Sequence, residues 1–191
     1  MDAAEWFARE VLPRIRAVRP AAVFEVVGYT STGEKRRLGA IPGVKVVGQV
    51  PSIAEAVAGA AVGVCPMRLG AGVQNKLLEY MALGLPSVTT SVSLAGLEAK
   101  PGEHLLLANT ADEMAAAVLR LFDDRALARS LAEAARAYVE QHHVWSAKLD
   151  PLVRRLDRLI TARRREARPA ARARGRSALP MPGLRRALWP R

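Results

Sequence analysis

The residues most suited to chemistry lie close together in residues 70–79, where two glycines are followed by an amide, an ammonium group and a carboxylate. Gly70 and Gly72 carry no side chains, so backbone N–H groups there can approach an anion closely. If a helix follows, its N-terminus adds a favourable dipole for a phosphate or diphosphate. Asn75 and Glu79 are four residues apart, on one helix face, with Lys76 beside them. A carboxylate in that place can accept two hydrogen bonds from a vicinal diol such as a ribose.

The helix itself is predicted from an apolar stripe. Val73, Leu77 and Met81 recur every four residues, which places them on one face toward a core. Gly84 ends the helix and Pro86 prevents its return. Arg68, just upstream, could neutralise phosphate charge, as could the lysine of the helix.

A simpler interpretation stays open for each of these residues. A glycine pair before a helix is common, and Lys76 and Glu79 also have the spacing of an ordinary surface ion pair. The second loop of interest, 89–104, contains Ser91, Ser93 and the backbone of Ala95–Gly96, which could contact diphosphate or sugar or could form a generic polar loop.

The elements that must position these residues alternate between two types. Short apolar, β-branched runs predict strands, and longer periodic runs with N-cap residues predict helices. The expected strands are 22–28, 44–50, 60–67, 86–90 and 104–108. The expected helices are 5–18, one turn at 34–38, 52–60, 73–83, 110–124, 125–143 and 145–160. This order predicts an α/β fold of Rossmann type, a mostly parallel sheet with helices on both faces. The glycine-containing stretch then lies at the carboxyl edge of the sheet, where such folds bind ligands.

The net charge of +11 belongs mostly to one end of the chain. Residues 163–191 contain ten arginines and a single acid, whereas residues 1–162 hold 19 basic and 17 acidic groups. The sequence therefore predicts a folded domain at 1–162 and a disordered Arg/Pro/Ala-rich tail at 163–191. Such a tail could bind an anionic membrane surface or nucleic acid, but it has one aromatic residue and no base-reading module, which disfavours nucleic acid.

The remaining composition excludes several classes of protein. The start of the chain lacks an apolar signal core, and the single cysteine, Cys65, excludes an internal disulfide and fits a buried apolar position. We therefore expect a cytoplasmic protein, with peripheral contact to the inner face of a membrane as an option. His104, His142 and His143 do not have the spacing of metal ligands, so neither a metal nor another cofactor is predicted.

The sequence of residues 66–90, PMRLGAGVQNKLLEYMALGLPSVTT, strongly resembles the nucleotide-binding signature of GT-B glycosyltransferases of the group-one, family-four type. The order of elements over residues 5–160 is similar to the carboxy-terminal half of such enzymes. The motif GVQNKLLE further resembles the corresponding motif in the branch of this family that is linked to bacterial exopolysaccharide and exosortase gene clusters. Two alternatives to a glycosyltransferase stay open. An epimerase or phosphorylase could share the GT-B fold, and the chain could instead be a non-enzymatic binding fragment.

The resemblance implies a partner, a UDP- or GDP-sugar, and roles for particular residues. Glu79 matches the family's second motif glutamate, which binds the ribose hydroxyls, and Asn75 lies beside it. The first motif glutamate falls on Ala71, followed by the expected Gly72, so direct contact with the donor sugar is in question. Lys76 and Arg68 are then the nearby cations for the diphosphate, since the family's own arginine and lysine lie upstream of the matching region. Catalytic residues are not identified.

In the intact family, sugar transfer generally retains the anomeric configuration and often needs no bound metal. The resemblance also implies an amino-terminal half that carries the acceptor site, so we expect this chain to lack that half and the first strand of its own sheet. On that expectation, the isolated chain binds nucleotide and is inactive in transfer.

Overall fold

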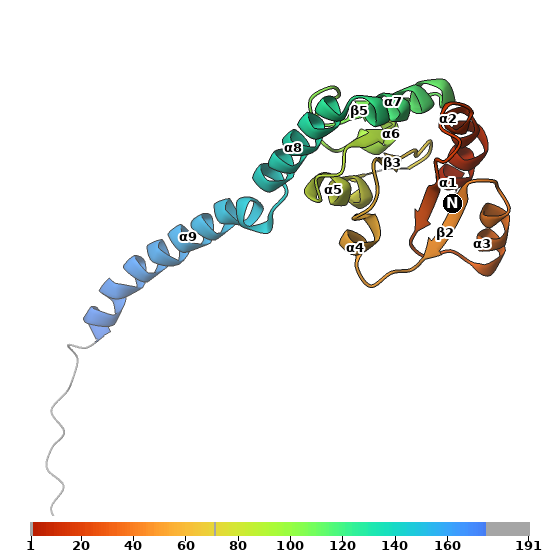
Figure 1. The fold of residues 1–191 in the computed structure, drawn as a ribbon. Helices are drawn as coiled ribbons and strands as arrows, with labels where there is room; N and C mark the ends of the chain where they lie inside the picture. The colour runs from red at the N-terminus through yellow and green to blue at the C-terminus, as the bar shows by residue number, and fades with distance from the viewer. Residues whose placement is uncertain (1, 71, 175–191) are drawn as a thin grey trace, which may run out of the picture. The chain divides into compact units, whose positions relative to one another are not determined.

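The computed structural model describes the backbone of residues 2–70 and 72–174, with side chains for 2–70, 72–144 and 149–164. It divides into two units, Met1–Val144 and Trp145–Arg191, of which the first contains all five strands (Figure 1). The helical segments are α1 (Asp2–Trp6), the π-helix η1 (Phe7–Val11), α2 (Leu12–Val18), α3 (Thr32–Gly39), α4 (Ile53–Val57), α5 (Asn75–Ala82), α6 (Ser91–Leu94), α7 (Ala111–Asp123), α8 (Arg125–His142) and α9 (Trp145–Arg174). The strands are β1 (Phe24–Val27), β2 (Val44–Gly48), β3 (Gly63–Cys65), β4 (Ser87–Thr89) and β5 (Leu106–Leu107).

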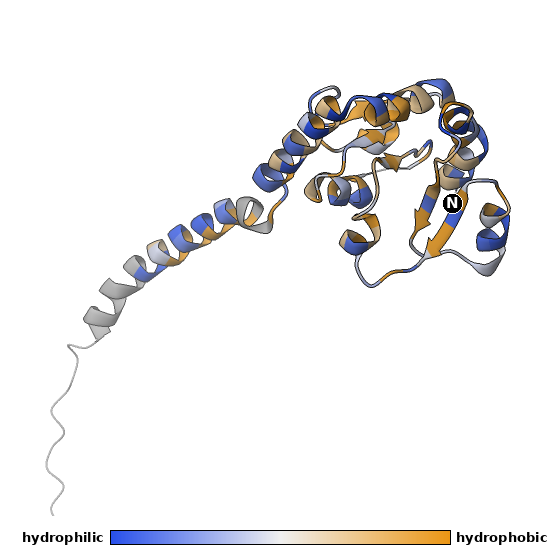
Figure 2. Ribbon diagram, in the orientation of Figure 1, coloured by the Kyte–Doolittle hydropathy of each residue, from blue (hydrophilic) through white to orange (hydrophobic). Residues whose placement is uncertain are grey.

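All strand pairings are parallel, as the alternation of elements predicts. The strands form two groups, β1–β2 and β3–β4–β5, with no pairing between β1 and β3 in the described chain. The expected single sheet is therefore interrupted. The strands are mostly apolar (Figure 2), as is usual when helices cover both faces of a sheet.

Two separate cores show that helices do cover both faces of the β3–β4–β5 group. On one face, η1, α2 and α7 contribute residues such as Phe7, Ile15 and Met114 to a cluster that includes Val88 of β4. On the other face, α5 and α8 pack through a second cluster that includes Leu77, Met81, Ala135 and Val139. Together these two layers make a doubly wound α/β unit.

Pro13 explains the unusual first helix. A proline inside an α-helix removes one hydrogen bond and clashes with the carbonyl one turn earlier. Here the helix widens to a π-turn just before the proline, where the N–H of Leu12 donates to the carbonyl of Phe7. Pro13 then falls in the first turn of α2, where its missing N–H is harmless.

Capping boxes set the start of two helices, α3 and α7. Thr110 and Glu113 form a reciprocal capping box at α7, and Ser31 and Glu34 form another at α3. The box makes α3 eight residues long, where the sequence predicted a single turn. Helix α6, which begins after the N-cap Thr90, falls in a segment that was expected to be a loop.

Two further expectations are wrong. Val73 precedes α5 and is 45% exposed, so it does not belong to the buried stripe of that helix. Residues 163–174 are helical, because α9 continues to Arg174, whereas a disordered tail was expected from residue 163. The rest of the tail, 175–191, lies outside the described residues.

Candidate functional site

The glycine-containing loop lies where the sequence placed it, between the end of β3 and the start of α5. Gly72 has φ of 78°, and a Cβ built on it meets no atom within 4 Å. Glycine is therefore needed there for its backbone conformation, and the loop is open on that side. Gly70 also has positive φ. Ala71 lies outside the described residues.

The structure brings the second predicted loop into contact with the first. Gly96, which follows α6, has φ of 92°. A Cβ on Gly96 would lie 3.4 Å from the Val73 side chain and 3.6 Å from the carbonyl carbon of Gly72. The exposed backbone of Ala95–Gly96 thus adjoins the glycine loop. The loops that follow β3 and β4 meet at the carboxyl edge of the sheet, where doubly wound folds bind ligands.

The first turn of α5 is open to a ligand. Its N-cap residue, Gln74, makes no side-chain capping bond, and its side-chain amide donates to the carbonyl of Gly72 at 3.3 Å. Asn75, Lys76 and Glu79 are all exposed. They project from the side away from the core, because Leu77 and Met81 of the same helix are fully buried. All three side chains of the predicted group are thus accessible, and their role in binding a ligand stays a prediction.

Arg68 lies near the loop but is engaged elsewhere. Its guanidinium pairs with both carboxylate oxygens of Asp2, at 2.5 and 3.2 Å. It also lies over the indole ring of Trp6, with Cζ 5.5 Å from the ring centroid. The side chains of Arg68 and Asp2 are each about half exposed. An incoming anion would therefore compete with Asp2 for this arginine.

The two serines of the second loop have different roles. Ser93 is fully buried, and its hydroxyl donates to the carbonyl of Cys65 at 2.8 Å, so it ties α6 to β3 and is not accessible to a ligand. This corrects the expectation that Ser93 contacts phosphate or sugar. Ser91 is exposed, and its N–H and hydroxyl both donate to Oδ1 of Asn109 at 2.9 Å. Asn109 is a neighbour of the site that the sequence analysis missed, since it lies 18 residues away.

His104 has a structural role. It is 9% exposed, and its Nδ1 accepts a hydrogen bond from the backbone of Lys100 at 2.9 Å. Its ring packs against Tyr138 of α8, whose hydroxyl accepts the N–H of Glu98 at 3.0 Å. Tyr138, which no local sequence signal marked, therefore holds the end of the second loop in place.

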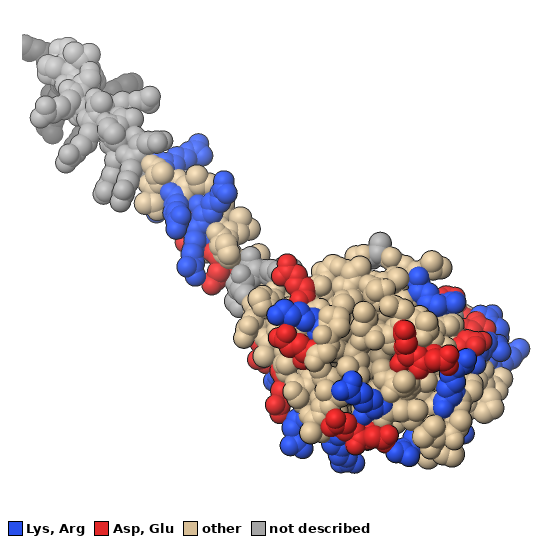
Figure 3. All heavy atoms as spheres, turned by 90° about the horizontal axis from the view of Figure 1, so that it is seen from above, with Lys and Arg blue, Asp and Glu red and all other residues tan. Residues whose placement is uncertain are grey.

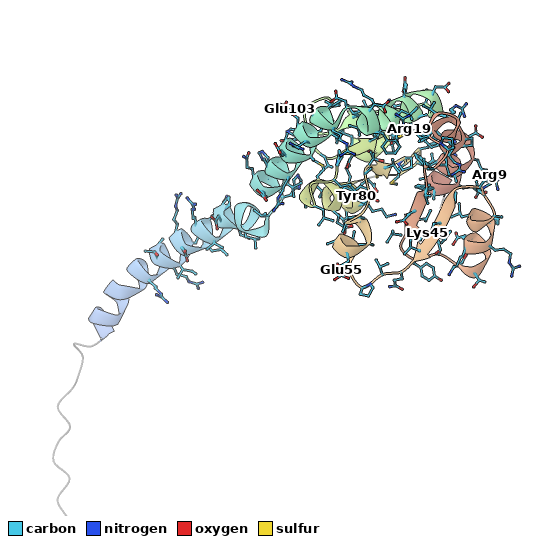
Figure 4. All side chains as sticks on the ribbon, in the orientation of Figure 1. Arg9, Arg19, Lys45, Glu55, Tyr80 and Glu103 are labelled. Carbon is cyan, nitrogen blue, oxygen red and sulfur yellow. The ribbon has the colours of Figure 1, made fainter. Side chains whose placement is uncertain are left out.

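A cleft of about 530 Å³ lies beside the site, between β1 and β3. Two residues of α5 line it, Lys76 and Tyr80, of which Tyr80 is labelled in Figure 4. Burial is the main cause that raises the pKa of the Tyr80 phenol. Asn75 and Glu79 are not among its lining residues. Cys65 is 3% exposed, which confirms that this cysteine is a buried residue of the core, and its burial raises the pKa of the thiol.

The described part of the chain lacks two further features. No group of three or more histidine, cysteine, aspartate or glutamate side chains there could hold a metal ion. None of its helices combines the length and hydrophobicity needed to span a membrane.

An α/β unit with glycine-containing and polar loops at one sheet edge is typical of nucleotide-binding domains. Comparison with known proteins identifies the family of such domains to which this chain belongs. Residues 1–124 match the sequence profile of the family described as glycosyl transferases, group 1. The chain belongs to this family. No curated protein sequence matches it.

Solved structures of similar fold include glycosyltransferases. Sucrose-phosphate synthase from Thermosynechococcus elongatus is 25% identical, with a TM-score of 0.61 over 80% of this chain and 42% of that one. HepE from Anabaena, solved with UDP-glucose, is 19% identical, with a TM-score of 0.62 over 80% of this chain and 46% of that one. WaaG, a glycosyltransferase involved in lipopolysaccharide biosynthesis, is 21% identical, with a TM-score of 0.56 over 74% and 42%. The chain thus spans less than half the length of these proteins. Its fold is that of one of the two halves of a GT-B glycosyltransferase.

Proposed function

We propose that the unit formed by residues 1–144 binds the nucleotide diphosphate of a sugar donor, UDP or GDP, for a glycosyltransferase. The observation that carries the proposal is the contact between the Gly70–Gly72 loop and Gly96, next to the open first turn of α5. Gly70, Gly72 and Gly96 carry no side chains, so an anion can approach the backbone of both loops at one edge of the sheet, which suits a diphosphate.

Each nearby side chain has a role in this proposal. Lys76 neutralises diphosphate charge, and Arg68 joins it when the anion displaces Asp2. Glu79, one turn further along α5, accepts hydrogen bonds from the ribose hydroxyls, with Asn75 beside it. The diphosphate is held by N–H groups and cations, without a metal ion or other cofactor.

The proposal extends to the reaction only for a complete enzyme. Transfer with retention, in bacterial polysaccharide or glycolipid synthesis, would require an amino-terminal half that supplies the acceptor site. The role of this unit in such a reaction is to position the donor and to stabilise the departing diphosphate. That HepE was crystallised with UDP and with UDP-glucose supports a nucleotide-sugar as the ligand class.

Calorimetry with UDP, GDP and ADP tests the assignment. Glu79→Gln should weaken binding of the preferred nucleotide by about 1–3 kcal/mol, the cost of unmade hydrogen bonds to a charged group, or roughly 5- to 150-fold in Kd. Glu133→Gln is the matched control, because Glu133 is an exposed glutamate on α8. Equal Kd values for the Glu79 variant and the parent protein would refute the ribose role.

A second proposal concerns the unit Trp145–Arg191, which we infer binds an anionic membrane surface. Residues 145–191 contain 14 Lys and Arg against three Asp and Glu, whereas residues 1–144 contain 15 of each kind. Figure 3 shows basic and acidic side chains interspersed on the first unit, and both kinds also along the described part of α9. The whole net charge therefore belongs to the second unit.

The described part of α9 is also amphipathic. Its exposed apolar residues follow a spacing of three and four, namely Leu149, Leu152, Val153, Leu156, Leu159 and Ile160. Arg154, Arg155 and Arg158 lie on the opposite side by helical periodicity. A basic amphipathic helix of this kind lies in the membrane interface, with its apolar side toward the acyl chains.

Co-sedimentation with phosphatidylserine vesicles tests the membrane proposal. Binding should weaken as salt is raised, and Leu156→Asp should weaken it by about 2 kcal/mol or more, since a buried leucine is worth about that amount. Ala162→Asp serves as the control for added charge. Binding that is insensitive to Leu156→Asp but is competed by RNA would favour nucleic acid instead.

A further inference from the structure

The second loop of the proposed donor site is held from its far side by a short segment, residues 97–104. This segment follows Gly96 directly, and its apolar side chains Leu97 and Ala99 are buried in the cluster that α5 and α8 share. On the near side, Ser93 of α6 ties the loop to β3. The backbone of Gly96 therefore keeps its place beside the Gly70–Gly72 loop only while the segment that follows it is also fixed.

Tyr138 of α8 fixes the start of this segment through its hydroxyl group. The hydroxyl oxygen accepts the N–H of Glu98, two residues after Gly96, at 3.0 Å. The same oxygen lies 3.2 Å from Nε2 of His143. Tyr138 is 7% exposed, and its ring is part of the core. Because the core holds the ring while the hydroxyl alone reaches the segment, Tyr138→Phe removes this hydrogen bond and leaves the packing in place.

His104 fixes the end of the segment, and it can do so only as a neutral imidazole. Its Nδ1 accepts the N–H of Lys100 at 2.9 Å. A nitrogen that accepts a hydrogen bond carries no proton, so the ring proton is on Nε2, which lies 3.5 Å from the carboxylate of Glu103. Protonation at Nδ1 would set two N–H groups against each other. The bond from Lys100 is therefore present where the imidazole is neutral and is lost as pH falls.

The ionised groups of the segment itself compensate a charge on His104 only weakly. The side chain of Glu103 is more than half exposed, and its carboxylate also pairs with the ammonium group of Lys100 at 3.4 Å. Water and this second cation both weaken the attraction that Glu103 exerts on a protonated imidazole.

Helix α8 brings two further imidazoles to the same place. His104 packs on the Tyr138 ring with the two centroids 5.0 Å apart, and His142 and His143 lie against that ring at 5.0 and 5.3 Å. Unperturbed imidazoles are half protonated near pH 6.5. Acid therefore adds like charges around one tyrosine in the pH range in which His104 loses its bond to Lys100.

We propose that Tyr138 and His104 are positioning residues for the donor diphosphate, and that full affinity requires His104 to be neutral. This inference rests on the proposed function, because the diphosphate would meet the Gly96 backbone that the two residues hold in place. The affinity for a nucleoside diphosphate should therefore depend on both residues. The affinity for a nucleoside, which has no phosphate for this loop to bind, should depend on neither.

Amide hydrogen exchange of the full chain without nucleotide, measured by NMR, tests the anchor at His104. Between pH 7.5 and 5.5 the protection factor of the Lys100 amide should fall about tenfold, because pH 5.5 is one unit below half-protonation of an imidazole. His104→Asn should retain the protection, since its amide oxygen replaces Nδ1 as the acceptor and does not titrate. His142→Asn, the same change at an exposed histidine on the same ring, should leave the fall in place. Equal protection of Lys100 at both pH values in the parent would overturn the requirement for a neutral His104.

Titration with UDP, GDP and their nucleosides tests the connection to the donor site. At pH 7.5, Tyr138→Phe should raise the Kd of the preferred nucleoside diphosphate about two- to tenfold, the effect of one lost hydrogen bond. It should change the Kd of the nucleoside by less than about twofold. From pH 7.5 to 5.5 the Kd of the diphosphate should rise about tenfold more in the parent than in His104→Asn, a comparison that cancels protonation of the ligand itself.

Two results would overturn the positioning role while leaving the donor site intact. One is an unchanged affinity of Tyr138→Phe for the diphosphate, and the other is an equal loss for diphosphate and nucleoside. A parent chain that binds no nucleoside diphosphate at pH 7.5 would refute the donor site itself and the positioning role with it. The exchange of the Lys100 amide would still decide whether neutral His104 holds the segment.

Discussion

Gly63 of β3 lies directly beneath the aromatic ring of Tyr80. A Cβ built on Gly63 would lie 2.7 Å from Cδ2 and 2.9 Å from Cγ of that ring, and 3.0 Å from a methyl group of Leu85. Carbon atoms in good contact lie about 3.5–4.0 Å apart, so Gly63→Ala forces the ring and the helix that carries it to move. Overpacking of this kind costs about 1–3 kcal/mol, and we expect about 2 kcal/mol because two neighbours are involved.

Urea denaturation followed by far-UV circular dichroism measures this loss. The same substitution in a Tyr80→Ala background should cost at least about 1 kcal/mol less, because the atoms nearest the new methyl group are then absent. Gly59→Ala is the matched control. A Cβ on Gly59 meets nothing within 4 Å, so its effect should stay within about 0.5 kcal/mol. An equal loss for Gly63→Ala in both backgrounds would refute the explanation through Tyr80.

Three other outcomes are expected. The Cys65 thiol, whose pKa is raised by burial, should react with a disulfide reagent at pH 8 at least about tenfold more slowly than the same thiol in urea, because the thiolate is the reactive form; equal rates would contradict its burial. Hydrogen bonds from the backbone of Asn109 and Thr110 lower the pKa of Glu113, so its stabilising effect should be complete above the ordinary glutamate pKa of about 4.3 and be lost as pH falls through the lowered value; Glu113→Gln should therefore reduce the free energy of unfolding at pH 7 more than at pH 2, and the same reduction at both would contradict this. Asp2→Asn releases Arg68 from its ion pair and should tighten nucleotide binding by about two- to fivefold, the range of a surface ion pair of up to about 1 kcal/mol, whereas unchanged calorimetric affinity would remove Arg68 from the diphosphate site.

Local patterns were sufficient for the five strands and most of the helices in the described chain, but not for α6 or for the ends and exposure of the elements. The alternation of apolar and periodic runs predicted the five parallel strands and the helices on both faces. The spacing of Thr110 and Glu113 predicted the start of α7, because a capping box depends on residues three apart. Val73 fits the same helical period as Leu77, yet it is exposed, because α5 begins only at Asn75.

The parts of the candidate site that the sequence did not predict depend on contacts between distant residues. Arg68 meets Asp2, 66 residues away, and Ser93 donates to the carbonyl of Cys65, 28 residues away. Neither contact has a periodic or spacing signal. The proximity of Gly96 to Gly72 follows from the order of β3 and β4 in the sheet, which fixes where the two loops emerge.

The π-turn of the first helix fixes more than its own geometry. The wide turn holds one residue more than an α-helical turn would, so deleting a single residue from Phe7–Val11 would force this turn into α-helical geometry, in which Pro13 again clashes with the carbonyl one turn earlier. The preceding segment would then rotate by about 100° about the helix axis. Trp6 and Asp2 would turn away from Arg68 while Leu12 and Ile15 stayed in the core. Insertions and deletions in this short segment would therefore rotate one end of the helix only at the expense of the core contacts of Phe7 and Ala8.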